Sequence, residues 1–276
     1  MALDFLKILA RPKLTEPNMI AAWPGVSNVA ILAATYIAKH LNCKELAALR
    51  PQYFFEPNGM IVRDSLVEGA QFPTNGFFYY KNKKGRDLIV FIGEVQPTSN
   101  TYGFSHALID VAEHFHVKCI YTSAAIISHM HHTETPHVYG VGTNEKIINH
   151  LSANGIDLGG NIQIANMNGL ILGAAQERGL DGACILAGVP NYATHMNNPP
   201  AALAIVKTLA SLLEINVDLE DMEKYANDAR EDLKQMASEA LGDYIDFFTE
   251  PIWENPESRF NDDIDDDEDE NFNEDN

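Results

Sequence analysis

Residues 20–30 read Ile20-Ala21-Ala22-Trp23-Pro24-Gly25-Val26-Ser27-Asn28-Val29-Ala30, and this stretch decides the fold. Its apolar start has the length of a buried strand, and Pro24 ends that strand because proline lacks a backbone N–H. Gly25 can adopt a positive φ, so we expect the chain to reverse there. Ser27 or Asn28 can then cap a helix, whose apolar residues recur at helical spacing: Val29, Leu32, Ala33, Tyr36, Ile37 and Leu41.

A strand that leads into a helix through a glycine turn leaves backbone N–H groups facing a crevice at its carboxyl end. In open α/β sheets, ligands and partners bind at that edge. The alternative is an ordinary βα turn in which Gly25 only makes the bend.

Length and composition indicate a globular chain. Of its 276 residues, 46% are hydrophobic and 21% are charged, which is enough apolar mass for one large core or two small ones. The three cysteines, Cys43, Cys119 and Cys184, are spaced too widely for a disulfide framework or a metal pattern, so we expect a cytoplasmic location. We expect no signal peptide and no membrane span, because no apolar run is long enough.

The charge balance is strongly acidic. The formal net charge is −20, and ten acids and no base lie in residues 261–276. Nucleic acid is therefore not expected as a partner, because binding it requires a basic surface. Order is expected to decay from Phe247, and residues 261–276 cannot bury apolar surface, so we predict an acidic disordered tail at 247–276.

Strands and helices alternate along the chain, which predicts a three-layer αβα fold. Residues 77–80 and 88–93 flank a Lys/Asn/Gly loop and predict an antiparallel hairpin, which makes the sheet mixed. Further strands are expected at 53–55, 60–62, 119–127, 138–141, 162–165 and 183–186, and helical segments at 45–50, 102–116, 169–179 and 199–213.

The domain organisation follows from this pattern. We predict an α/β core domain at residues 1–195, a C-terminal helical hairpin packed on it at 196–246, and the tail at 247–276. The second helix of the hairpin carries apolar residues at alternating spacings of three and four, which suits packing within the chain or across a dimer: Leu219, Met222, Ala226, Ala229, Leu233, Met236 and Ala240.

Catalytic and metal signals are weak. Seven of the ten histidines lie between His106 and His137, and imidazoles beside Glu134 could hold zinc. Their spacing matches neither a metalloprotease helix nor a zinc finger, so we interpret the run as a solvated polar loop. Glu94 follows a central strand and could act as an acid or base, or could bridge loops instead. No catalytic residue, metal ligand or cofactor is assigned.

The loops at the strand ends form the candidate binding surface. Four of them are expected to line the crevice, at residues 23–28, 94–98, 166–170 and 190–192. The candidate binding residues are Trp23, Pro24, Gly25, Asn28, Glu94, Gln96, Gly169, Leu170 and Tyr192.

Four short motifs in these loops resemble those of a known family. Residues 22–30 resemble its strand–turn–helix signature, and Ile92-Gly93-Glu94-Val95-Gln96-Pro97 resembles its GE-x-QP loop. Asn168-Gly169-Leu170-Ile171-Leu172 is similar to its G-GLLL helix start, and Val189-Pro190-Asn191-Tyr192 to its P-x-Y segment. The family is the proteasome assembly chaperone 2 family, whose prokaryotic members are often classed as ATP-grasp-like. The motifs keep the family order across residues 20–240.

The resemblance implies a phosphorylase/hydrolase-like αβα domain with a C-terminal helical pair, self-association as a trimer or larger, and a chaperone or scaffold role. Proteasome subunits are the partners in eukaryotic and archaeal relatives. Some relatives end in a hydrophobic–Tyr–any-residue motif that docks in proteasome pockets, whereas this chain ends Asn273-Glu274-Asp275-Asn276.

The expected function is therefore a non-catalytic, assembly-chaperone-like or scaffold protein. It would be a cytoplasmic homo-oligomer that binds protein partners, with proteasome subunits as one candidate, and neither nucleic acid nor membranes. The alternative is a small-molecule enzyme of the nucleosidase/phosphorylase or ATP-dependent ligase type that uses the same crevice, with Glu94 as acid or base.

Overall fold

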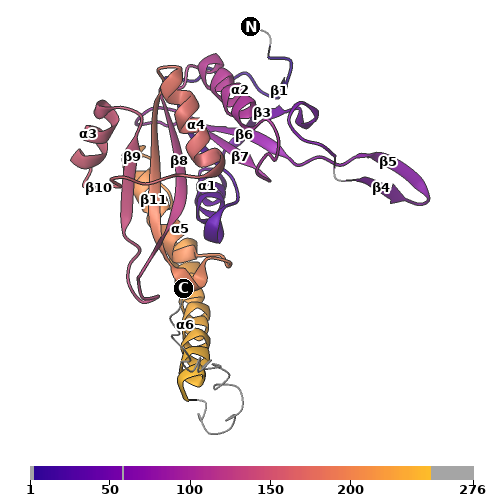
Figure 1. The fold of residues 1–276 in the computed structure, drawn as a ribbon. Coiled ribbons are helices and arrows are strands. Elements are labelled where there is room, and N and C mark those ends of the chain that lie inside the picture. The colour runs from indigo at the N-terminus through magenta and orange to yellow at the C-terminus, as the bar shows by residue number, and fades with distance from the viewer. Residues whose placement is uncertain (1–2, 58, 250–276) are drawn as a thin grey trace, which may run out of the picture.

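A nine-stranded mixed sheet forms the middle layer of the computed structural model, which describes residues 3–57 and 59–249 (Figure 1). The strand order is β1-β3-β6-β7-β2-β8-β11-β9-β10. The strands are β1 (Leu6–Ile8), β2 (Asn18–Ala22), β3 (Lys44–Leu49), β6 (Asn75–Tyr80), β7 (Leu88–Gly93), β8 (Cys119–Ser128), β9 (Val138–Gly142), β10 (Asp157–Leu158) and β11 (Asp181–Pro190).

The four central strands, β7, β2, β8 and β11, run parallel. The longest pairing joins β8 and β11 over ten residue pairs, from Asp181 opposite Cys119 to Pro190 opposite Ser128. Strands β1, β3 and β6 extend the sheet on the β7 side through antiparallel pairs, and β9 lies antiparallel to β11. The sequence prediction of a mixed sheet with an antiparallel β6–β7 hairpin is confirmed.

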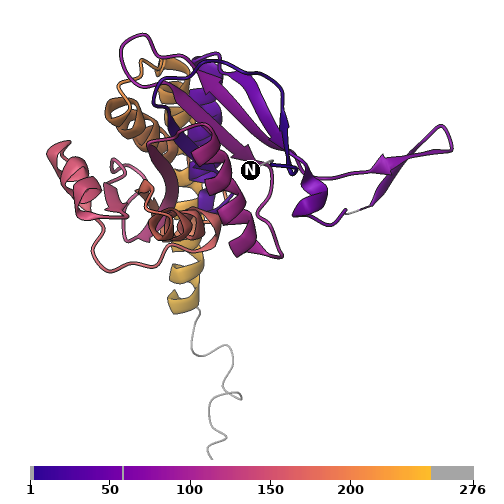
Figure 2. The ribbon, with the colours of Figure 1, turned by 90° about the horizontal axis from the view of Figure 1, so that it is seen from above.

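Helices cover both faces of the sheet, which confirms the three-layer αβα prediction (Figures 1 and 2). The residues of β2 alternate between two cores, with Ile20 and Ala22 in one and Met19 and Ala21 in the other. Because β2 is buried on both faces, it has the continuous apolar sequence that is typical of a central parallel strand. Helices α1 (Val29–His40), α3 (Glu145–Ala153) and α5 (Pro199–Leu212) cover the first core, and α2 (Thr101–His114) and α4 (Asn166–Glu177) cover the second.

The last helix, α6 (Glu220–Thr249), packs against α5 and then extends away from the body (Figure 1). Tyr36 of α1 fixes its start, because the Tyr36 hydroxyl donates to the Asp218 carbonyl at 2.8 Å and accepts from the Met222 N–H at 3.2 Å. The predicted apolar seam of α6 is buried within its own chain at Met222, Ala226, Ala229 and Leu233.

A separate two-stranded hairpin, β4 (Met60–Arg63) and β5 (Leu66–Ala70), projects from the body (Figures 1 and 2). Val62 faces Val67 across the hairpin, and these side chains are 63% and 67% exposed. Met60 and Leu66 are exposed as well. An isolated hairpin is marginally stable in water, so this arm, residues 60–70, gains little from its own packing.

Three local predictions were wrong. Residues 45–50 were expected to be a helical turn, but 45–49 belong to β3, because pairing with β1 and β6 outweighs the helix propensity of Glu, Leu and Ala. Residues 53–55 do not form a strand; instead, Phe54 and Phe55 turn inward and contact the Phe104 ring with centroid separations of 5.0 and 5.7 Å. Residues 162–165 form no strand.

Residues 247–249, predicted to belong to the tail, form the end of α6, which continues through Thr249. Residues 250–276, the rest of that tail, lie outside the described part of the chain.

Candidate functional site

The turn after β2 differs from its prediction. Gly25 is extended, with φ −163° and ψ −162°, and the chain reverses at Ser27 and Asn28, whose φ values are 53° and 51°. Neither side chain caps α1. Instead, the Ser27 hydroxyl donates to the Ala193 carbonyl at 2.9 Å, and the Asn28 amide donates to Asn197 Oδ1 at 2.8 Å. The turn is thus fastened to the segment that follows β11.

Trp23 supports this turn from inside. It is fully buried, and its ring lies 5.1 Å from Phe91 and 6.4 Å from Phe104 between centroids. A Cβ on Gly93 would lie 2.5 Å from the Trp23 indole, so the glycine leaves the space that the indole occupies. Trp23 therefore positions the loop around it and offers no surface to a partner.

Gln96 joins three of the predicted loops. Its side-chain Nε2 donates to the Pro24 carbonyl at 2.9 Å, and its Oε1 accepts from the Met167 backbone N–H at 3.2 Å. The loops after β2 and β7 and the first turn of α4 therefore meet at the carboxyl ends of the central strands. One amide side chain holds them in register, because it donates to one loop and accepts from another.

Gly169 allows α4 to begin close to the preceding loop. A Cβ at this position would lie 2.0 Å from the Ile164 carbonyl oxygen, so no larger residue fits without a shift of the backbone. Thr122 of β8 donates its hydroxyl hydrogen to the Asn168 carbonyl at 3.1 Å and ties the helix start to the sheet. Leu170, the next residue, is 37% exposed.

Tyr192 connects the fourth loop to the histidine run. Its hydroxyl lies 3.3 Å from His132 Nδ1, and the His132 ring lies 4.0 Å from the His131 ring. His132 is buried, so that part of the run is not solvated as expected, and burial lowers the pKa of His132. Within residues 3–57 and 59–249, no group of three or more His, Cys, Asp or Glu side chains could hold a metal ion.

Glu94 braces the loop that precedes β6. Its exposed carboxylate accepts two hydrogen bonds at 2.7 Å, from the Thr74 backbone N–H and from the Thr74 hydroxyl. These bonds, the backbone one first, lower the pKa of Glu94. Glu94 is therefore ionised near neutral pH and is engaged as an acceptor.

A glutamine at position 94 tests this bracing role. The stabilisation from the ionised carboxylate is complete above the ordinary carboxyl pKa of about 4.5 and disappears as the pH falls through the lower pKa of the folded protein. We therefore expect Glu94→Gln to melt a few degrees below the original protein near pH 7, and the two melting temperatures to converge below about pH 4. If the difference between the two melting temperatures stayed constant from pH 7 to pH 3, the bracing role of the ionised Glu94 would be contradicted.

A crevice of about 380 Å³ lies beside these loops, at the carboxyl ends of β8 and β11. Asn168, which is buried, lines it, and its Oδ1 has no hydrogen-bond partner among the described residues. The described residues that line the crevice include no acid, base or nucleophile, and Glu94 is not one of them: Gly25, Val26, Ala30, Ala124, Ala125, Ile126, Ile162, Gln163, Ile164, Ala165, Asn166, Asn168 and Leu186.

Large apolar side chains are exposed around the same loops. Val26 is 44% exposed, Val95 is 39% exposed and Ile127 is 57% exposed. Exposed apolar side chains that gather in one region mark interaction surfaces more often than reaction centres. We call these loops, without the buried Trp23, and their exposed apolar residues the carboxyl-edge surface: residues 24–28, 94–98, 166–170 and 190–192, with Tyr102, Ile127 and Ile162.

A mixed nine-stranded sheet, two helical layers and an edge of hydrogen-bonded loops define an αβα protein with a preformed surface at its carboxyl edge. A family profile described as "PAC2 family" matches residues 19–237. Because this match covers most of the 276 residues, the chain belongs to the PAC2 family. The resemblance seen in the sequence motifs is confirmed.

Solved structures with the same fold include two proteins of Pyrococcus furiosus. PbaB, described as an archaeal proteasome activator, has a TM-score of 0.71 and 23% identity over 84% of this chain and 98% of that one. PbaA, described as an archaeal homolog of proteasome-assembly chaperone, has a TM-score of 0.65 and 20% identity over 84% and 96%. An uncharacterized protein of Methanocaldococcus jannaschii is 25% identical over 222 residues, 77% of this chain and 80% of that protein.

No helix within the described residues is both long and apolar enough to cross a membrane.

Proposed function

We propose that this protein is a non-catalytic assembly chaperone or scaffold that binds protein partners through the carboxyl-edge surface. The observation that carries the proposal is the Gln96 bridge, which holds three loops in one arrangement beside exposed apolar side chains. A surface that is ordered before binding loses less conformational entropy when the partner docks. Membership of the PAC2 family supports a chaperone role.

The partner class that we propose is proteasome subunits. PbaB and PbaA, which share the fold, are described as a proteasome activator and a homolog of proteasome-assembly chaperone. A cytoplasmic location agrees with the three free thiols, Cys43, Cys119 and Cys184.

Charged substitutions on the carboxyl-edge surface test the proposal. We expect the Val26→Asp/Leu170→Asp double variant to lose its partners, because each change places a charge on an apolar contact. Leu158→Asp is the matched control, since Leu158 is 46% exposed on the edge strand β10 and lies outside the surface. The tagged proteins are purified from the native cell and bound proteins are quantified by mass spectrometry. Equal recovery of proteasome subunits with both variants would contradict the proposed surface, and their absence from all samples would contradict the proposed partner.

We further propose that the protein is a homo-oligomer, and that a second copy covers the projecting arm, residues 60–70. The apolar seam of α6 is already buried in its own chain as far as Leu233, whereas Val62 and Val67 are exposed on one face of the arm. The arm therefore offers an apolar contact region for the self-association that the family resemblance implies.

Light scattering at micromolar concentration tests the oligomer. We expect Val62→Lys/Val67→Lys to lower the molar mass toward that of one chain. Leu66→Lys is the control, because Leu66 pairs with Arg63 and so lies on the opposite face of the arm. A monomeric original protein, or a double variant of unchanged mass, would overturn the proposal.

A small-molecule reaction at the same edge is the second candidate function. The crevice of about 380 Å³ and the unpartnered Asn168 Oδ1 favour it. The absence of an acid or base among the described lining residues weighs against it. Thermal-shift measurements with adenosine, inorganic phosphate and ATP separate the two, since a saturable shift with any of them would favour the enzyme.

A further inference from the structure

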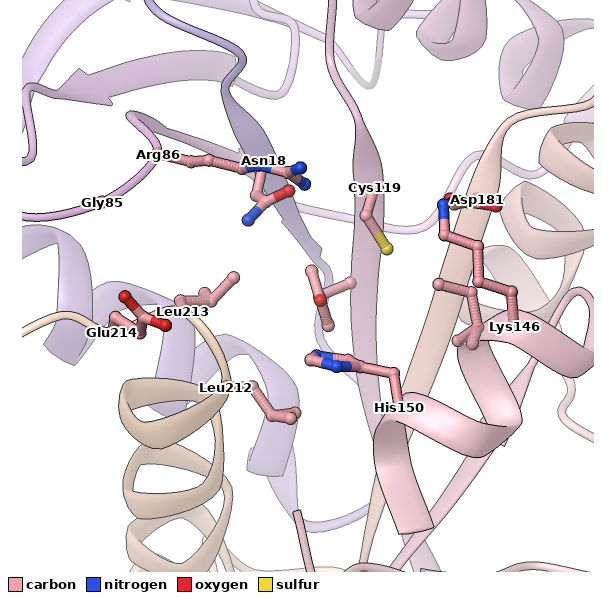
Figure 3. Close-up of a pocket in the computed structure, with 12 residues that line it drawn as sticks. Asn18, Gly85, Arg86, Cys119, Lys146, His150, Asp181, Leu212, Leu213 and Glu214 are labelled. Atoms are coloured by element: carbon pink, nitrogen blue, oxygen red, sulfur yellow. Dashed lines mark hydrogen bonds and ion pairs between the residues drawn. The ribbon is translucent and has the colours of Figure 1, made fainter. Parts of the chain in front are cut away.

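A second and larger cavity lies at the amino ends of the central strands, opposite the carboxyl-edge surface (Figure 3). It has a volume of about 520 Å³ and is lined by the first residues of three parallel strands, which are Asn18 of β2, Cys119 of β8 and Asp181 of β11. The β6–β7 loop, α3 and the end of α5 complete its walls. Because it lies at the amino ends of the strands, this cavity is separate from the carboxyl-edge surface.

Asn18 carries the first sign of a ligand. Its side chain is only 8% exposed and lines the cavity, and its Oδ1 has no hydrogen-bond partner among the described residues (Figure 3). Its backbone N–H is satisfied by the Asp87 carbonyl at 2.9 Å. Buried polar atoms are nearly always hydrogen-bonded in native proteins, so the free acceptor indicates a donor supplied from the cavity.

The charges around the cavity are compensated on one side only. Lys146 and Asp181 neutralise each other, with Nζ 2.5 Å from Oδ2, and Asn144 also donates to Asp181. On the other wall, Arg86 makes only a 3.9 Å contact from Nε to Glu16, and the Glu214 carboxylate has no ion pair among the described residues. One cation and one anion are thus available to a ligand.

The remaining lining is apolar. Leu212 and Leu213 at the end of α5 and Ile147 of α3 are 5–8% exposed. Figure 3 shows Leu212 and Leu213 on the same side as Arg86 and Glu214, with the His150 ring on the facing side. The cavity therefore combines two opposite charges, one unsatisfied acceptor and an apolar wall.

We infer that this cavity binds a small zwitterion with an apolar body, of the class of free apolar α-amino acids. Its carboxylate would contact Arg86, and its ammonium group would donate to Asn18 Oδ1 and face Glu214. Its side chain would lie against Leu212 and Leu213. A bare inorganic anion fits less well, because the unpaired Glu214 carboxylate would repel it and the apolar wall would stay uncovered.

Titration calorimetry of the full chain tests this inference with L-phenylalanine and L-leucine as probes. We expect saturable binding of at least one of them. Phenylpropionate, which lacks the ammonium group, and phenethylamine, which lacks the carboxylate, should each bind about tenfold more weakly or worse. Failure of both amino acids to bind at about 10 mM, or equally tight binding of inorganic phosphate, would overturn it.

Two variants locate the binding. Arg86→Gln should weaken the amino acid about tenfold, whereas Lys84→Gln removes the same charge from the same loop outside the cavity and should change the affinity by less than about twofold. Asn18→Leu should abolish binding and raise the melting temperature of the empty protein, because it removes an unsatisfied acceptor. Unchanged affinity in Arg86→Gln contradicts the assignment even if Asn18→Leu fails to fold.

Discussion

Replacing Gly169 with alanine is expected to destabilise the protein by about 2 kcal/mol, whereas the same change at Gly173, one helical turn later, should not. The alanine Cβ at position 169 would lie 2.0 Å from the Ile164 carbonyl oxygen, which is backbone and cannot rotate away. At Gly173 nothing lies within 4 Å of the added carbon, and the residue is exposed in α4. Alanine there should stabilise the helix by about 0.5–1 kcal/mol.

Urea unfolding of both variants measures this difference. Both changes replace glycine with alanine in the same helix. A loss of stability at position 169 and a gain at position 173 would therefore be due to the close approach of the loop to Gly169. We also expect Gly169→Ala to bind protein partners less well, because a shift of the α4 start moves Leu170 on the carboxyl-edge surface. Equal stability of the two variants would contradict this prediction, because it would mean that the loop around Ile164 can move aside without loss of stability.

Loss of the Gln96 side chain is expected to have the second large effect. Gln96→Ala leaves the Pro24 carbonyl and the Met167 N–H without their partner, which costs about 2 kcal/mol and releases three loops from one another. Partner recovery from the native cell should fall more than stability alone would explain, since the surface is no longer ordered before binding.

Gln96→Glu is the matched variant. A carboxylate can still accept from the Met167 N–H at the start of α4, where a negative charge is favourable, but it cannot donate to Pro24. We therefore expect intermediate stability and intermediate partner recovery. Full stability and full recovery in Gln96→Ala would contradict the bridging role.

The layers of the fold could be predicted from the sequence because they depend on local patterns. The apolar run that ends at Pro24, the β6–β7 hairpin loop and the helical periodicity after Asn28 each carry their signal within about a dozen residues. The β3 prediction failed because its sequence favours a helix, and only pairing with β1 and β6 makes it a strand.

The candidate site was predicted in outline only. The sequence placed Gln96 and Gly169 in strand-end loops, but it did not reveal their contacts. Gln96 bonds to Pro24 and Met167, each about 70 residues away in the chain. Gly169 lies against the Ile164 backbone, a close approach that depends on the folded structure. The reversal was assigned to Gly25, whereas Ser27 and Asn28 take the left-handed conformation, held by bonds to Ala193 and Asn197. The cavity at the amino ends of the strands could not be predicted from the sequence, because its lining residues come from six separate segments.

The strand order has a consequence for how the protein is made. The second strand of the chain, β2, pairs with β7 and β8, and β8 in turn pairs along its whole length with β11, which ends at Pro190. During translation, the ribosome must therefore release most of the chain before the centre of the sheet can close. Until then an apolar strand edge is open, so this protein completes its folding late and slowly, after synthesis of about two thirds of its length.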